Sequence, residues 1–381
     1  MRGSGRKNII LRYSLRTERN GKKRPFFPMI PFSKPDLTLT CAGRQGKLPA
    51  MRIVFMGTGD IAIPAFRSLI RHSDLAGLYE VSDRRNMAEK PVRGIAPVER
   101  LLERLLREWK PDAVVCTYMV YPYMLDSLAS RTGRAVPYLT VVTDSFVINK
   151  SWLCSKSPLW AVTDPWTRAI MEEKGLPQDR LRVTGFPVNP VLGALAKEHP
   201  LSWKEGEPFR VLYFAQRSAR HARAELAGML DANPALHVTC ILGRRFRRIY
   251  PRIRDLRARY GRRLTVRGWT RRVPSYLAAS HVVVGKAGGA TVHEVLAAAR
   301  PMLVNFLLPG QEEGNTRLLE KLGGGGHVPD VRALASALQE MMADGGAQWR
   351  RMHENLLRAG MTGGSGRIAD LALKLAEEHT N

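Results

Sequence analysis

Short runs of apolar residues alternate with amphipathic stretches along most of the chain. Residues 97–109 repeat Val, Leu and Trp at the spacing of one helix face, and Lys110-Pro111-Asp112 ends that pattern. Apolar runs of strand length lie at 51–57, 113–117, 138–143, 210–215, 238–242, 264–268, 281–284 and 301–306. Further helical patterns lie at 61–70, 331–343, 349–359 and 368–378. Short apolar strands that alternate with helices are typical of an α/β fold with parallel sheets.

The spacing of these runs predicts two α/β domains. We expect the first at 51–190 and the second at 210–365, and a chain of 381 residues is long enough for both. Residues 191–209 are predicted to be the linker, because this part of the chain and its surroundings are rich in proline. The last segment, 366–381, is predicted to form a helix that packs back on the first domain.

Residues 1–50 differ in composition from the rest of the chain. They are rich in Arg, Lys, Pro and Ser and show no sustained periodicity, which predicts disorder. Two explanations stay open. The segment has part of the composition of a transit peptide, or the start codon is assigned too early and Met51 is the true start, which is the interpretation we favour.

The net charge is strongly positive. Sixty Lys and Arg against 34 Asp and Glu give +26, and residues 244–272 alone hold thirteen arginines and one acid, Asp255. Such a surface favours an anionic membrane or nucleic acid, although a solvated arginine-rich face is the simpler interpretation. No zinc-finger, RRM or KH pattern is present, so nucleic acid is the less favoured partner.

Two bulk properties bear on location. No apolar run approaches the ~20 residues that a spanning helix needs. The four cysteines are scattered and show no metal-binding spacing, which fits a reduced cytosolic compartment. We therefore expect a soluble or peripheral protein.

The stretch 285–315 carries the strongest chemical signal. Glycines at 285–289 follow an apolar strand and open a helical pattern, so backbone N–H groups at a helix N-terminus are available to an anion. Lys286 can add a point charge, and Gly288 and Gly289 allow close backbone approach. Glu294 lies one turn into the helix, where a carboxylate can accept hydrogen bonds from a ribose diol. The pattern predicts a nucleotide site that holds a sugar donor, with a ligand-free tight turn as the alternative.

The same residues resemble a known family, the lipid-linked glycosyltransferases that include monogalactosyldiacylglycerol synthase and processive diacylglycerol glucosyltransferase. The matching positions are Lys286, Gly288, Gly289, Thr291, Glu294, Arg300-Pro301, Gly310, Gln311, Glu312, Gly314 and Asn315. Ala287 stands where the family has proline, and Ala299 where it has glycine. The resemblance covers roughly residues 98–365. It implies the GT-B fold, with two Rossmann-like domains whose parallel sheets face a cleft, and an N-terminal domain that is short for the family.

The resemblance implies further donor contacts. Gly268 and Trp269 precede the loop that faces the base, although Trp269 as a core residue is the alternative. Gln311 and Glu312 would contact the sugar hydroxyls. Asn315 would orient their loop or cap the following helix.

On the acceptor side the resemblance points to the sequence after the strand at 138–143. Asp144 ends that strand and is the best candidate for a catalytic or acceptor-orienting carboxylate, with a helix-capping aspartate as the alternative. Asn149 stands near a family histidine, and Trp152 matches a family tryptophan.

Two loops depart from the family. Arg217 and Ser218 replace a glycine-rich loop, and their region would bind the diphosphate through arginine instead. The turn at 56–65 lacks the histidine that would act as general base, which makes Asp60 a second candidate base.

That turn also carries a second resemblance. Residues 51–70 are similar to the start of methionyl-tRNA formyltransferase, and the similarity then fades. A fused or rearranged reading frame would explain it. Two alternatives therefore stay open, an inactive nucleotide-sugar-binding remnant and, less favoured, a formyltransferase.

The leading hypothesis is an inverting, metal-independent glycosyltransferase. It would move a hexose from a nucleotide sugar, most plausibly a UDP-hexose, to a lipid hydroxyl such as that of diacylglycerol. The first domain would bind the acceptor and the second the donor, with no cofactor besides the UDP-sugar substrate. We expect a cytoplasmic protein, peripheral on the anionic inner face of the plasma membrane.

Overall fold

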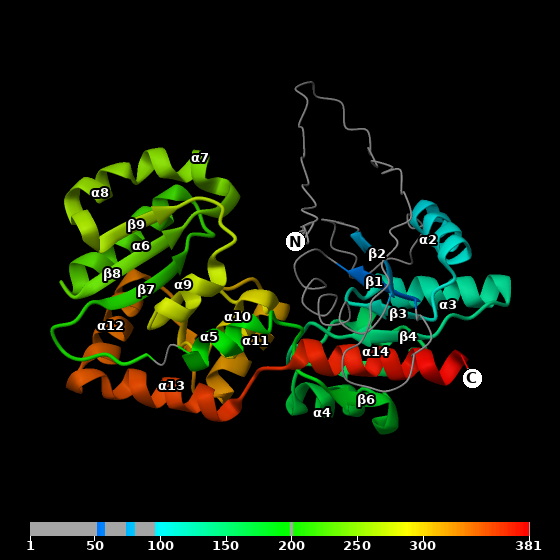
Figure 1. The fold of residues 1–381 in the computed structure, drawn as a ribbon. Helices are drawn as coiled ribbons and strands as arrows, with labels where there is room; N and C mark the ends of the chain where they lie inside the picture. The colour runs from blue at the N-terminus through cyan, green and yellow to red at the C-terminus, as the bar shows by residue number, and fades with distance from the viewer. Residues whose placement is uncertain (1–51, 58–73, 81–95, 199–200, 381) are drawn as a thin grey trace, which may run out of the picture. The chain divides into compact units, whose positions relative to one another are not determined.

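The computed structural model describes residues 52–57, 74–80, 96–198 and 201–380, and these all fall within one compact unit of the chain (Figure 1). The basic extension 1–50, the helix expected at 61–70 and the candidate base Asp60 lie outside the described residues.

Six parallel strands form the first sheet, in the order β2-β1-β3-β4-β5-β6. The strands are β1 (Arg52–Gly57), β2 (Asp74–Glu80), β3 (Ala113–Cys116), β4 (Tyr138–Val141), β5 (Leu159–Val162) and β6 (Leu181–Val183). Every residue of β3 and β4 is buried, as expected for parallel strands that are covered on both faces.

The second sheet is also parallel and has the order β12-β11-β10-β7-β8-β9. Its strands are β7 (Phe209–Phe214), β8 (Leu236–Ile241), β9 (Leu264–Arg267), β10 (Val282–Lys286), β11 (Met302–Phe306) and β12 (Gly325–His327). The strand order reverses between β7 and β10, and ligands of such sheets bind beyond the carboxyl ends of the strands at that point. The predicted fold class, α/β with two parallel sheets, is confirmed.

Helices connect the strands and cover the sheets. The described helices are α2 (Ala96–Trp109), α3 (Val120–Thr132), α4 (Pro165–Glu173), α5 (Val191–Glu198), α6 (Ala219–Ala232), α7 (Phe246–Ile249), α8 (Arg254–Tyr260), α9 (Val273–Ala279), α10 (Gly289–Ala297), α11 (Gln311–Lys321), α12 (Val331–Met342), α13 (Ala347–Ala359) and α14 (Gly364–Thr380). The segment expected as a linker contains α5, whose Leu192 is buried in the core of the second sheet together with Val292 and Val295 of α10.

The C-terminal helix α14 packs on the first sheet. Its Ile368, Ala369 and Ala372 are buried in one cluster with Ile53 of β1 and Val115 of β3. Figure 1 shows α14 as the red helix beside β3 and β4 of that sheet. The end of the chain therefore completes the core that its first described strand begins.

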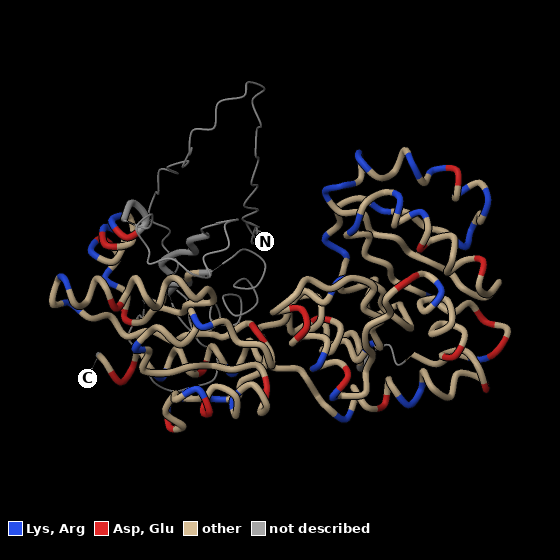
Figure 2. The backbone as a smooth tube through the Cα atoms, turned by 180° about the vertical axis from the view of Figure 1, so that it is seen from behind, with Lys and Arg blue, Asp and Glu red and all other residues tan. Residues whose placement is uncertain are grey.

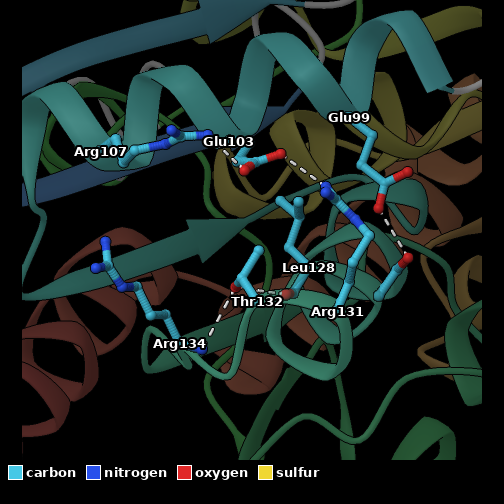
Figure 3. A network of polar contacts seen from close by, with 8 residues as sticks. Glu99, Glu103, Arg107, Leu128, Arg131, Thr132 and Arg134 are labelled. Atoms are coloured by element: carbon cyan, nitrogen blue, oxygen red, sulfur yellow. Dashed lines mark hydrogen bonds and ion pairs between the residues drawn. The ribbon is translucent and has the colours of Figure 1, made fainter.

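Helices α2 and α3 are joined by a polar network (Figure 3). Glu103 of α2 accepts hydrogen bonds from Arg107 at 2.5 Å and from Arg131 of α3 at 2.7 Å. Ser127 of α3 donates to Glu99 at 2.7 Å. The hydrogen bond from Arg131 is the main cause that lowers the pKa of Glu103. The network joins the two helices at the surface of the protein.

The arginine-rich segment 244–272 forms α7, α8, β9 and the short helices and turns between them. Figure 2 shows Lys and Arg positions recurring along this part of the backbone. Asp255 is paired in a bidentate manner with Arg223, at 2.6 Å for both bonds. Arg247, Arg248 and Arg254 are exposed, and within the described part of the chain they form no ion pair. Their positive charge is therefore directed to solvent.

Candidate active site at the carboxyl ends of the strands

The candidate residues gather where three strands end. The loop 142–147 follows β4 in the first sheet, and the N-termini of α10 and α11 follow β10 and β11 in the second. Gln311, the first residue of α11, donates a hydrogen bond from its side-chain amide to Asp144. This bond brings a residue predicted for the donor sugar against the residue predicted as base.

The glycine turn after β10 is shorter than the sequence predicts. Gly285 and Lys286 belong to β10, so only Ala287 and Gly288 lie between the strand and α10. A Cβ at Gly289 would lie 3.1 Å from the Thr143 carbonyl oxygen, which is tighter than ordinary contact. Glycine at 289 therefore lets the N-terminus of α10 approach the β4 loop.

The first turns of α10 carry the other predicted donor residues. Thr291 and Glu294 are both half-buried on this helix. Gly288 is the N-cap residue and supplies no side-chain cap, so the first N–H groups of α10 remain available to an anion.

Glu312 has two partners in the structure. It is buried, forms an ion pair with Lys286 at the end of β10, and accepts a hydrogen bond from the Leu308 amide at 2.8 Å. Both carboxylate oxygens are engaged, so Glu312 positions Lys286 beside the glycine turn. A direct contact of Glu312 with a sugar would require exchange of one of these bonds.

Asn315 connects α11 to the glycine turn. It is fully buried, and its side-chain amide donates to the Ala287 carbonyl at 2.9 Å. It is the fifth residue of α11, so the prediction that it caps a helix is wrong, whereas the loop-orienting alternative agrees with this bond. Its Oδ1 is buried and accepts no hydrogen bond within the described part of the chain.

Asp144 is held by two donors. The Trp152 indole donates to Oδ2 at 2.7 Å, and Gln311 donates to Oδ1. The carboxylate is only 4% exposed, and burial raises its pKa to about 6 even though both hydrogen bonds lower it. Because its oxygens accept from these side chains, the helix-capping interpretation of Asp144 is not supported. Trp152 is itself buried and acts on the site through Asp144.

The residues after Asp144 fix the loop against the second sheet. Ser145 is fully buried and contacts His293 of α10, with 3.2 Å between Oγ and Nε2. Phe146 has φ of 58°, in the left-handed region, and Val147 N–H donates to the Ser145 carbonyl at 2.6 Å across it. A Cβ at Gly314 of α11 would lie 2.0 Å from the same Ser145 carbonyl. The tight turn therefore fits only against a glycine.

His293 is buried on the inner face of α10. Its ring stacks on Phe186 with 4.3 Å between centroids, and burial lowers its pKa to about 4. Ser145 also contacts Thr163, which donates to Asp164 at 2.7 Å. The loop that carries Asp144 thus lies on a continuous polar chain that links α10 to α4.

Four residues predicted for the site lie outside the hydrogen-bonded group around Asp144. Arg217 pairs with the buried Glu225, and Ser218 is the N-cap residue of α6. Trp269, after β9, is 60% exposed beside Gly268, so its interpretation as a core residue is wrong. Asn149 caps the short helix Lys150–Leu153 by accepting from the Ser151 amide. None of the four shares a described hydrogen bond with Asp144.

Sequence reasoning did not select Ser145, His293 and Gly314. Ser145 directly follows Asp144, and His293 directly precedes Glu294. Their adjacency in the sequence to predicted site residues could therefore have identified them. Gly314 belongs to the motif at 310–315 but had no assigned role. Among the described residues, no group of three or more His, Cys, Asp or Glu side chains is arranged to hold a metal ion.

The fold is that of the GT-B glycosyltransferases. Similar solved structures include MurG from Acinetobacter baumannii (TM-score 0.61, 14% identity, 86% of this chain and 100% of that chain). A glycosyltransferase from Rickettsia africae ESF-5 is also similar (TM-score 0.55, 14% identity, 88% of this chain and 100% of that chain). The UDP-GlcNAc 2-epimerase from Neisseria meningitidis is a third (TM-score 0.60, 13% identity, 87% and 100%). At these identities the likeness defines the fold alone.

Sequence comparison finds similarity to glycolipid-synthesising enzymes over part of the chain. Residues 61–188 match the model of monogalactosyldiacylglycerol (MGDG) synthase. The processive diacylglycerol β-glucosyltransferase of Staphylococcus carnosus is 25% identical over 252 residues, which cover 65% of this chain and 63% of that protein. The enzyme of the same description from Bacillus subtilis is 24% identical over 285 residues, 73% of each chain. The chain thus spans less than two thirds of the S. carnosus protein, and the predicted resemblance is confirmed.

A short segment is similar to a different protein. Over 34 residues the chain is 88% identical to methionyl-tRNA formyltransferase of Akkermansia muciniphila, which is 9% of this chain and 11% of that protein. The predicted second resemblance is therefore also confirmed, and it is confined to a small part of either chain.

Proposed function

We propose that this protein is a hexosyltransferase that moves a hexose from a nucleotide sugar, a UDP-hexose, to the hydroxyl of diacylglycerol. The observation that carries the proposal is the contact between Asp144, at the end of β4, and Gln311, at the N-terminus of α11. It joins a buried carboxylate on one sheet to the anion-binding edge of the other. The similarity to processive diacylglycerol glucosyltransferases and to the MGDG synthase model supports the acceptor class.

The donor would bind at the carboxyl edge of the second sheet. Its diphosphate would meet the first N–H groups of α10 and the Lys286 ammonium, which Glu312 holds in place. Glu294 would accept hydrogen bonds from the ribose hydroxyls. Gly268 and Trp269 would border the base, and Arg217 and Ser218 the diphosphate from the β7 side. Gln311 would contact a hydroxyl of the sugar.

The reaction would be a single displacement with inversion. The acceptor oxygen attacks the anomeric carbon, the bond from that carbon to the diphosphate oxygen breaks, and the departing charge is stabilised by the N-terminus of α10. Asp144 takes the proton of the acceptor hydroxyl. Because burial raises the pKa of Asp144 to about 6, its carboxylate form predominates above about pH 6 and is still basic enough for this role.

The lipid acceptor implies contact with a membrane. No helix in the described part of the chain is long and apolar enough to span a bilayer. We therefore propose a peripheral protein at the inner face of the plasma membrane, held by its arginine-rich surface. Exposed Arg247, Arg248 and Arg254 would contact anionic headgroups.

The test is turnover by the full chain with radiolabelled UDP-glucose or UDP-galactose and diacylglycerol in anionic vesicles. Glu294→Gln should lose donor affinity, whereas Glu340→Gln, at an exposed position of α12, should behave as the wild type. A glycolipid product together with UDP release is the expected result. Saturable UDP-hexose binding without product would identify a nucleotide-sugar-binding protein without transferase activity, and no binding would refute the donor site.

A further inference from the structure

The two hydrogen bonds to Asp144 differ in how easily they can be broken. Trp152, the donor to Oδ2, is 2% exposed and packs in the core with Val142, Trp160 and Met171. Gln311, the donor to Oδ1, is an exposed residue at the first position of α11. Rotation of the Gln311 side chain needs no change in the core. Oδ1 is therefore the oxygen that can be released.

The Gln311 amide also lies where a donor would arrive. A Cβ built on Gly289, the first residue of α10, would be 3.7 Å from Gln311 Nε2 and 3.8 Å from Asn315 Nδ2. The amide therefore borders the N-terminus of α10, the group of N–H donors that suits a diphosphate. A hexose attached to that diphosphate would present its hydroxyls to the same amide.

We propose that Gln311 gates Asp144: its amide blocks Oδ1 until the hexose of a nucleotide sugar takes over the Gln311 hydrogen bond. This inference rests on the proposed function and adds an order of binding to it. When Gln311 donates to a sugar hydroxyl, Oδ1 is free to accept the proton of the lipid hydroxyl. The acceptor can be deprotonated only after the donor is in place.

Release of Gln311 makes Asp144 more basic, which favours removal of the proton from the acceptor hydroxyl. A hydrogen bond donated to the charged carboxylate lowers its pKa, so withdrawal of Gln311 raises the pKa further while burial continues to act. Titratable groups face this region from four other elements. His293 on α10 and Asp164 before α4 connect to Ser145, and Glu312 of α11 is paired with Lys286 of β10.

The experiment measures the pKa of Asp144 directly, independently of turnover. The full-length protein is labelled with carboxyl-¹³C aspartate, and Asp144→Asn identifies the resonance. The resonance is titrated with pH in the presence of buffer alone, UDP, or UDP-hexose. Gln311→Ala is the test variant. Gln339→Ala is the matched control, because Gln339 of α12 donates to the Ala232 carbonyl, a contact that does not involve the candidate site.

The expected result has three parts. In the wild type and in Gln339→Ala, UDP-hexose raises the pKa of Asp144 and UDP alone does not. In Gln311→Ala the pKa is already raised without ligand, and UDP-hexose adds nothing.

Two results would overturn the gate alone. One is an unchanged Asp144 pKa at saturating UDP-hexose in a wild-type protein that turns over. The other is a Gln311→Ala protein whose Asp144 titrates as in the wild type. If UDP-hexose shifts no resonance and gives no product, the proposed function fails and the gate fails with it.

Discussion

The carboxyl edges of the two sheets present different chemical groups. At the second sheet the site consists mainly of backbone, namely the N-termini of α10 and α11, with glycines at 288, 289 and 314 and one paired cation, Lys286. At the first sheet the described site is a single buried carboxylate, Asp144, fixed by side chains that arrive from elsewhere in the chain. One edge is suited to hold an anion, and the other to hold a proton.

This difference decides whether a site can be recognised from the sequence or only from the folded structure. An anion site made of backbone is local, so its residues follow one another in the sequence and form a readable motif. The environment of Asp144 depends on Trp152, eight residues away, and on Gln311, 167 residues away. Its burial and raised pKa are properties of the folded chain.

The strongest test of the contrast is Asp144→Asn. If the first edge supplies only the base, kcat should fall by about 10²–10⁴-fold while the Kd for UDP, which lacks the hexose proposed to contact Gln311, stays within about twofold. Steady-state kinetics and calorimetric titration measure the two quantities. Asp126→Asn is the control, since Asp126 accepts from Tyr138 and from the Lys156 amide in the same half of the molecule. A kcat unchanged by Asp144→Asn would assign the base to another residue.

A second test asks whether the exposed arginines of the second half bind membranes or contribute to the candidate active site. Replacing Arg247, Arg248 and Arg254 by Gln should weaken binding to phosphatidylglycerol-containing vesicles by roughly a hundredfold at low salt, at about 1 kcal/mol per arginine. Vesicle flotation measures it, and turnover of a short-chain soluble diacylglycerol should not change.

The matched control removes three exposed arginines from α11, α12 and α13, at positions 317, 332 and 351. Equal losses in both triple variants would mean that total charge, not this surface, governs binding. Tighter binding of the wild type to duplex DNA than to vesicles would assign the surface to nucleic acid instead.

A third test adds one methyl group where the two edges meet. Gly314→Ala puts a Cβ against the Ser145 carbonyl, so the loop of Asp144 must shift; we expect a loss of about 1–3 kcal/mol in unfolding free energy and a lower kcat. Gly366→Ala in α14 meets open space and should stabilise the protein slightly, as alanine does inside helices. Denaturant unfolding compares the two. A Gly314→Ala protein as stable and active as Gly366→Ala would show that the contact is dispensable.

The smallest effect expected is in the pH dependence of stability. The pKa of Asp144 is raised on folding, so protonation favours the folded state, and ionisation removes stability as pH rises from about 4 to about 6. Relative to the wild type, Asp144→Asn should therefore gain stability by about 2 kcal/mol between those limits. Unfolding free energies of both proteins across that range give the difference. A difference that does not vary with pH would mean that Asp144 titrates normally.

Much of the fold was readable from the sequence, because parallel strands buried on both faces are continuous apolar runs. The runs at 113–117, 138–143 and 301–306 correspond to β3, β4 and β11. Strands β2, β5, β6 and β12 were not predicted. The last two have only three residues each, and β12 contains two glycines. Helix α5 was assigned to a linker because prolines surround it.

The candidate site, like the fold, could be predicted from the sequence only in part. The motif at 286–294 predicted the turn before α10, but it could not show that Glu312 is bound to Lys286 or that Asn315 bonds to Ala287. Both are contacts between separate strand-helix units. His293 is a further case, because a histidine on an apolar helix face gives no sign in the sequence that a serine from the other sheet will meet it.

The position of α14 has a consequence for how the molecule is made. Ile368 and Ala372 complete the core around Ile53 and Val115, so the first sheet cannot bury that face until α14 has emerged from the ribosome. During synthesis the second sheet, whose segments are contiguous from β7 to α13, can close before the first. A nascent chain of this protein would thus carry a closed second sheet while one face of the first sheet is still uncovered. Exposed apolar strands of that kind are the surface that chaperones bind.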